Sequence, residues 1–252
     1  MKDKVSRDNR KALPKFLVMI LAAALVGGAV GFFSGMASDS FSGEALQARV
    51  EAALTALVPW GLPVCMAVLL IPAAVLLGKA RAQFAAWDGE DEDVGFALED
   101  RLNVVMLLSV LAMIVGFFFL SVGMLYAWES LRLLANTAFF VVDMVAIMLL
   151  QQKVVDLTRR MNPEKEGSVY DRKFKKKWFE SCDEAERAQI GQASYQAFQT
   201  TSGICLIVWL VLLLGSLFYP MGILPTLSVL VIYGVLQCRY LTECIRMHRR
   251  TR

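Results

Sequence analysis

The fold is decided by residues 103–151, which read NVVMLLSVLAMIVGFFFLSVGMLYAWESLRLLANTAFFVVDMVAIMLLQ. Two apolar runs, 103–128 and 131–151, are separated by a short turn that contains Glu129. A helix needs ~20 apolar residues to cross the ~30 Å hydrocarbon core of a bilayer, and both runs are long enough. The stretch therefore predicts an antiparallel pair of transmembrane helices.

Four more apolar runs lie on either side of this pair and are predicted as the spans 16–36, 54–78, 203–219 and 223–241. The chain of 252 residues is 57% hydrophobic, and the apolar residues are concentrated in these runs, as in an integral membrane protein. The first run is longer than the 7–15 residue core of a signal peptide, so we expect an uncleaved helix. The predicted fold is all-α, a single polytopic membrane domain with six transmembrane helices in three hairpins and a cytosolic amphipathic helical segment.

The distribution of basic residues predicts the orientation of these helices. Of the 26 Lys and Arg residues, 24 lie within or at the edge of four segments, 1–15, 79–102, 152–202 and 242–252. Cytoplasmic loops carry such an excess of positive charge. We therefore expect a multi-pass protein of the plasma membrane with both termini in the cytoplasm.

Cysteine and histidine usage limits the chemistry that we expect. None of the five cysteines lies in a predicted outside loop, no pair has C-x-x-C spacing, and the single histidine, His248, lies in the basic tail. Structural disulfides, zinc sites and histidine-based catalytic triads are therefore not expected. We predict no catalytic residue, no metal, no cofactor and no enzymatic activity.

The long cytosolic segment carries its own structural signals. Asn162-Pro163 predicts the end of the helix that contains the fourth span. Residues 168–171 (SVYD) have the spacing of a capping box. Apolar side chains at Phe174, Trp178, Cys182 and Ala185 then predict one helix that continues toward the fifth span.

This segment also carries a resemblance to a known family. Residues 162–171 (NPEKEGSVYD), followed by KKW at 176–178 and ESCDEAE at 180–186, resemble the bacterial membrane proteins of domain of unknown function 3169. Residues 87–92 (WDGEDE) fit the same pattern. The resemblance covers nearly the whole chain and implies six helices in the plasma membrane of a mostly Gram-positive group. It assigns no activity, substrate or catalytic residue.

Asp143 is the main candidate for an intramembrane polar site, because it lies near the middle of the fourth span. A charge at that depth costs at least ~2.5–3.5 kcal/mol, and no other span has a Lys or Arg near its centre. Asn136 lies seven residues earlier on the same helical face. The candidate hydrogen-bond partners on other helices are Ser109, Ser121, Ser216, Tyr233 and Gln237. Two interpretations remain open, a proton or cation site and a neutral acid that joins helices, and the second is favoured.

A ladder of small residues occurs in the first span, at Gly27, Gly31 and Gly35. Small residues at this spacing allow two membrane helices to approach closely. Packing within the monomer is favoured over a dimer face, since five other helices are available. The oligomeric state is not predicted.

A basic run in the long cytosolic segment is the candidate contact surface. It consists of Arg172, Lys173, Lys175, Lys176 and Lys177, interleaved with Phe174 and Trp178. Three interpretations compete with a plain topogenic signal: anionic lipid headgroups, ion pairs with the acidic loop 88–93, or a soluble partner. Nucleic acid is not expected as a partner. The acidic loop does not match a calcium-binding loop.

The predicted function follows from topology more than from chemistry. The predicted outside loops are short, and the most elaborate soluble region faces the cytoplasm. We therefore expect a non-enzymatic accessory, sensor or regulatory subunit that lies in the bilayer and contacts a cytosolic or membrane protein. The alternative is a transporter or an exporter permease subunit that uses Asp143 as an intramembrane polar site.

Overall fold

The computed structural model describes residues 43–126, 130–216 and 222–250, together with isolated positions between 14 and 32. The glycine ladder predicted at 27, 31 and 35 lies outside the described residues. The described residues form helices and the turns that connect them, with no strand among them. The chain divides into two compact units, one of residues 48–190 and one of residues 1–47 and 191–252.

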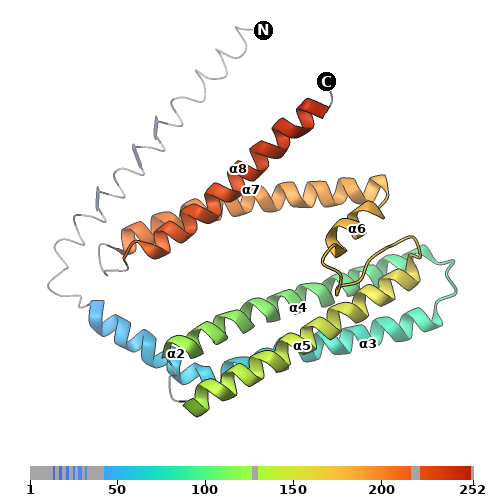
Figure 1. Ribbon diagram of the computed structural model, residues 1–252, viewed down its shortest axis with the longest axis horizontal. Helices are drawn as coiled ribbons and strands as arrows, with labels where there is room; N and C mark the ends of the chain where they lie inside the picture. The colour runs from blue at the N-terminus through green and yellow to red at the C-terminus, as the bar shows by residue number, and fades with distance from the viewer. Residues whose placement is uncertain are drawn as a thin grey trace, which may run out of the picture. The chain divides into compact units, whose positions relative to one another are not determined.

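The first described helical stretch combines three elements that follow one another directly (Figure 1): α2 (Gly43–Cys65), η1 (Met66–Leu70) and α3 (Ile71–Ala86). In the π-helical turn η1, the backbone N–H of Ile71 donates to the carbonyl of Met66, five residues earlier. Pro72 provides the reason, because a proline lacks an N–H and its ring clashes with the carbonyl four residues before it. The wider turn accommodates the proline without ending the helix.

Two long helices, α4 (Glu92–Tyr126) and α5 (Ser130–Met161), pack with this stretch as a three-helix bundle (Figure 1). Its main buried cluster contains Ala73, Leu77, Ala80, Leu98, Leu102, Val105, Leu150, Val154 and Leu157. The 35 residues of α4 span about 52 Å, more than the ~30 Å of hydrocarbon. The helices therefore extend past the predicted spans, and between α3 and α4 only residues 87–91 are not helical.

The predicted continuous helix from Phe174 is wrong, because the chain bends at residues 181–183 between α6 (Phe174–Glu180) and α7 (Glu184–Gly215). The N–H of Glu186 donates to Asp183 Oδ1 (2.8 Å), and the N–H of Asp183 donates to Glu186 Oε2 (3.0 Å). This reciprocal capping box starts a new helix at α7. The capping box predicted at 168–171 does not form, since Ser168 Oγ accepts the N–H of Tyr170 rather than that of Asp171, and the next helix begins only at Phe174.

In the other unit, residues 191–215 of α7 pair with α8 (Leu224–Arg250). Gln237 Nε2 donates to Ser202 Oγ (3.0 Å), and the rings of Phe198 and Tyr240 stack with centroids 4.4 Å apart. Among the described residues, five helical stretches are long and apolar enough to cross a membrane: Gln47–Ala86, Glu92–Tyr126, Leu131–Met161, Glu184–Gly215 and Leu224–Met247. The all-helical class and its membrane character are thereby confirmed for the described residues; the predicted span 16–36 lies largely outside them.

Small residues on α4 allow α5 to approach closely. Ser109, Ala112, Gly116 and Gly123 of α4 are all buried. A Cβ atom added to Gly123 would lie 2.3 Å from the amide nitrogen of Asn136 on α5, closer than real contacts allow. Gly123 is therefore the position at which a methyl group would displace a side chain that bonds across the interface.

We expect Gly123→Ala to lower the free energy of unfolding by about 1–3 kcal/mol, because it overpacks the interface and displaces the Asn136 amide. Gly78→Ala is the matched control, since a Cβ there meets nothing within 4 Å. The control should be neutral or stabilising by up to ~1 kcal/mol, because alanine is the better helix former. Thermal unfolding of the purified variants checks both. Equal shifts in the two variants would contradict the close approach at Gly123.

Candidate functional site

The connecting segment, which we define as residues 162–183 between α5 and α7, is attached to the ends of two helices. Asn162 Nδ2 donates to Glu99 Oε1 on α4 (3.0 Å). The Ser168 hydroxyl and the backbone N–H of Val169 both donate to Gln152 Oε1 on α5 (3.2 and 3.1 Å). The segment is therefore tied to both helices of the hairpin.

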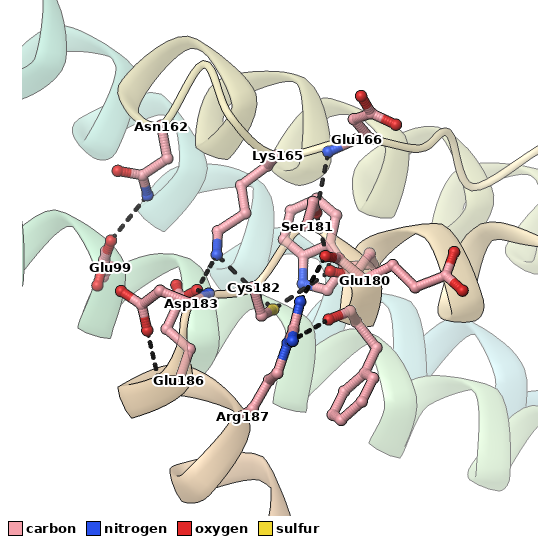
Figure 2. A network of polar contacts seen from close by, with 12 residues as sticks. Glu99, Asn162, Lys165, Glu166, Glu180, Ser181, Cys182, Asp183, Glu186 and Arg187 are labelled. Carbon is pink, nitrogen blue, oxygen red and sulfur yellow. Dashed lines mark hydrogen bonds and ion pairs between the residues drawn. The ribbon is translucent and has the colours of Figure 1, made fainter.

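Lys165 is the most buried charged side chain of the connecting segment, with 3% of its surface exposed. Its ammonium group pairs with the carboxylate of Glu186 and lies 3.7 Å from Cys182 Sγ (Figure 2). Burial acts to lower the pKa of Lys165, but the hydrogen bond and the charge of Glu186, with a contribution from Cys182, raise it above its ordinary value. Lys165 is therefore charged at neutral pH, with Glu186 as its counter-ion.

Glu186 has two structural roles in this network (Figure 2). Its carboxylate accepts both the Lys165 ammonium and the backbone N–H of Asp183, which caps α7. The next residue, Arg187, donates to the backbone carbonyls of Phe179 and Glu180 (3.3 and 2.7 Å). The start of α7 is thereby bonded to the end of α6 and to the connecting segment.

A cavity of about 600 Å³ lies between the connecting segment and the ends of α4, α5 and α7. Phe174 and Trp178 line it, with their ring centroids 5.5 Å apart. Gly167 has φ of +125°, and a Cβ there would come within 2.9 Å of the Phe174 ring. The two aromatics predicted as part of a contact surface are therefore partly buried against the protein.

The charges of the basic run are more exposed than its aromatics. Lys177 pairs with Asp171 (2.6 Å) and Lys176 with Glu180 (3.6 Å). The hydrogen bond from Lys177 holds the pKa of the Asp171 carboxyl below its ordinary value. Arg172, Lys173 and Lys175 are exposed.

The acidic loop 88–93 caps its own helix. Asp91 Oδ1 accepts the backbone N–H groups of Asp93 and Val94 at the start of α4 (3.0 and 3.4 Å). No ion pair joins this loop to residues 172–177 in the described part of the chain. The structure therefore gives no support to the interpretation in which the basic run pairs with the acidic loop.

Asp143 is buried in the α2–α4–α5 bundle with 2% of its surface exposed, and neither carboxylate oxygen has a hydrogen-bond partner among the described residues. Asn136 lies two turns earlier on the same face of α5, and its side-chain amide donates to the carbonyl of Phe119 on α4 (3.1 Å). Ser109 and Gln237, expected as partners of Asp143, bond to Gln151 and Ser202 instead. Among the described residues, no side chain forms the hydrogen bond that would make Asp143 a link between helices.

Comparison with known protein families gives a match that extends over most of the chain. A family model described as "Protein of unknown function (DUF3169)" matches residues 10–243, which include the bundle, the connecting segment and most of α8. The chain belongs to the DUF3169 family. No curated protein and no solved structure matches this DUF3169 chain significantly. The resemblance noted in residues 162–186 is thereby confirmed, and the family description adds no activity to the geometry.

Several residues of the polar contacts around the connecting segment were not predicted from the sequence, namely Glu99, Gln152, Lys165, Cys182 and Glu186. One local signal was available, because Asp183 and Glu186 have the spacing of a capping box. The partners Lys165 and Glu186 are 21 residues apart with a bend between them. Helical periodicity does not report such a contact.

Proposed function

We propose that this protein is a non-enzymatic accessory, sensor or regulatory subunit of the plasma membrane, with both termini in the cytoplasm. The supporting observation is the connecting segment, which is bonded to α4 and α5 through Glu99 and Gln152 and to α7 through Glu186. Its basic residues remain exposed. A protein or a membrane surface that binds these charges therefore contacts a segment that is hydrogen-bonded to three helices.

The exposed charges of the basic run are proposed to contact anionic lipid headgroups. A basic residue near an anionic membrane surface contributes about 1 kcal/mol to binding. Phe174 and Trp178 are partly buried and line the cavity, so the charges carry this contact. The partner of the regulatory role would then bind the segment beside the membrane surface.

A photo-crosslinking amino acid at Tyr170 tests the partner contact, because Tyr170 is 59% exposed within the connecting segment. In native membranes we expect a discrete protein adduct that is lost when Lys173, Lys175 and Lys176 are changed to Gln. The matched control places the same group at Phe96 on α4, which is 64% exposed. The same adducts from both positions, or none from Tyr170, would count against the regulatory role.

Thiol labelling tests the orientation of the chain. We expect Cys244 to react with a membrane-impermeant reagent in inside-out vesicles and not in intact cells, because the positive-inside rule places it in the cytoplasm. Cys182 lies in the predicted cytosolic segment 152–202 but is only 5% exposed, so it should react slowly from either side. Rapid labelling of Cys244 in intact cells would overturn the orientation.

Transport is the second candidate function, and the buried Asp143 with two unpaired oxygens favours it. Purified protein in liposomes loaded with a pH-sensitive dye gives a direct measurement. Under the proposed regulatory role, an imposed gradient of protons, Na⁺ or K⁺ should dissipate at the rate of empty liposomes. A faster rate that returns to the empty-liposome value in Asp143→Asn would favour the transporter.

A further inference from the structure

A groove of about 620 Å³ runs along the bundle between η1, α3 and α5. Its wall is mostly apolar and includes Met66, Ile71, Ala74, Gly78, Phe139 and Leu149. Residues 66–78 cover about 18 Å along the helix axis, close to the ~15 Å of hydrocarbon in one leaflet. The groove therefore has the length and the polarity to hold an acyl chain.

One end of the groove is cationic. Arg81 of α3 and Lys153 of α5 line it and also line an adjoining hollow of about 530 Å³, together with Arg160 and Asp156. Asp156 accepts a hydrogen bond from Gln152 Nε2 (2.7 Å). No carboxylate of the described residues forms an ion pair with Arg81, Lys153 or Arg160. This end has three cations against one carboxylate.

The cations lie at the depth at which a phosphate group is expected. Arg81 and Lys153 follow the predicted ends of their spans, at Gly78 and Gln151, by three and two residues, or about 3–5 Å of helix rise. The apolar wall lies on the hydrocarbon side of them. Basic pockets between transmembrane helices at this level bind phospholipid head groups.

We propose that this groove is a specific site for one anionic phospholipid, with an acyl chain along η1, α3 and α5 and the phosphate at Arg81 and Lys153. Charge complementarity at one end and the length of the apolar wall identify this occupant. None of the residues of the basic run lines the groove. The site is therefore separate from the peripheral lipid contact proposed for the connecting segment.

The head-group half is tested with Arg81→Gln/Lys153→Gln in the full chain, by native mass spectrometry during titration with phosphatidylglycerol and phosphatidylcholine. We expect the native chain to prefer phosphatidylglycerol and the variant to bind it about 30-fold more weakly, since each basic residue contributes a factor of five to six. Binding of phosphatidylcholine should not change. The matched control, Lys79→Gln/Arg239→Gln, removes the same charge from positions that line neither hollow and lie outside the basic run.

The acyl-chain half is tested with Gly78→Leu, which fills the groove while both cations remain. A Cβ at Gly78 meets nothing within 4 Å, so the fold should tolerate the change, and thermal unfolding in phosphatidylcholine verifies this. Displacing about two methylene groups of the lipid should weaken binding of phosphatidylglycerol about tenfold.

Three results would overturn the proposal. The first is equal binding of the two lipids by the native chain. The second is a thermal stabilisation by glycerol phosphate as large as that by phosphatidylglycerol, which would identify a site for a free anion. The third is unchanged phosphatidylglycerol binding in both groove variants, which would mean that another helix or a partner covers the groove.

Discussion

Glu186→Ala is expected to lower the free energy of unfolding by about 2–4 kcal/mol. The variant leaves the ammonium of Lys165, which is 3% exposed, without its counter-ion and also removes the acceptor that caps the N–H of Asp183. Breaking a buried ion pair costs ~3–5 kcal/mol, but Glu186 is 38% exposed, so solvent screening reduces this part. Loss of the capping interaction contributes ~0.5–2 kcal/mol.

Glu184→Ala is the matched control for this prediction, because it removes an acidic residue from the same first turn of α7. Urea or thermal unfolding of both variants gives the comparison. Cys182 provides an independent measurement, since its thiol should react faster once the network around Lys165 opens. Similar stabilities for the two variants would show that the Lys165–Glu186 pair contributes little to the fold.

The raised pKa of Lys165 defines the pH range of this effect. A group with a raised pKa in the folded state contributes its full stability below its unfolded pKa, ~10.4 for lysine, and loses it as the pH rises through the folded value. The difference between the native chain and Glu186→Ala should therefore be constant from about pH 6 to 9 and shrink above this range. A difference that shrinks between pH 9 and pH 6 would contradict the assignment.

Asp143→Val is expected to raise the free energy of unfolding by about 1–3 kcal/mol, an unusual direction for a buried substitution. Both carboxylate oxygens are buried without partners among the described residues, so the native side chain has lost its hydration without compensation. Valine is close in size and removes this penalty, against a helix-propensity cost below ~0.7 kcal/mol.

Asp143→Asn is the control for this prediction, because it keeps a polar group at the position and should give a smaller gain than valine. Thermal unfolding in nanodiscs measures both variants. Destabilisation by valine would show that Asp143 bonds to a partner outside the described residues. That result would restore the interpretation of Asp143 as a polar link between helices. Stabilisation with loss of a cellular phenotype would instead mark Asp143 as a functional residue.

The membrane helices were predictable because composition changes sharply where a chain leaves the bilayer. Asn162-Pro163 correctly predicted that α5 ends at Met161. The helix lengths were not predictable from hydropathy, since backbone hydrogen bonds continue into water and α4 begins at Glu92 within a segment rich in acidic residues. The bend at 181–183 was missed because the apolar stripe from Phe174 to Ala185 continues across it, while the Asp183–Glu186 cap interrupts the helix locally.

The candidate sites were predictable only in part. The sequence places Asp143 and Asn136 on one face of the fourth span, and both side chains are buried in the structure. The missing partners of Asp143 depend on how α4 and α5 pack, which periodicity does not report. Arg81 and Lys153 are distant in sequence, and only the packing of α3 on α5 places them at the end of one groove.

The π-helical turn η1 has a consequence for insertions and deletions. Each residue of an α-helix rotates the chain by about 100° around the helix axis, and a π turn contains one residue more than an α-helical turn. The π turn at residues 66–70 therefore sets the rotation of α3 relative to α2 around the helix axis. Removing a single residue there would rotate Arg81 about the helix axis and turn it away from Lys153, although the apolar character of the span would be unchanged. The geometry of the groove therefore constrains how many residues this short stretch can contain, which hydrophobicity alone would not.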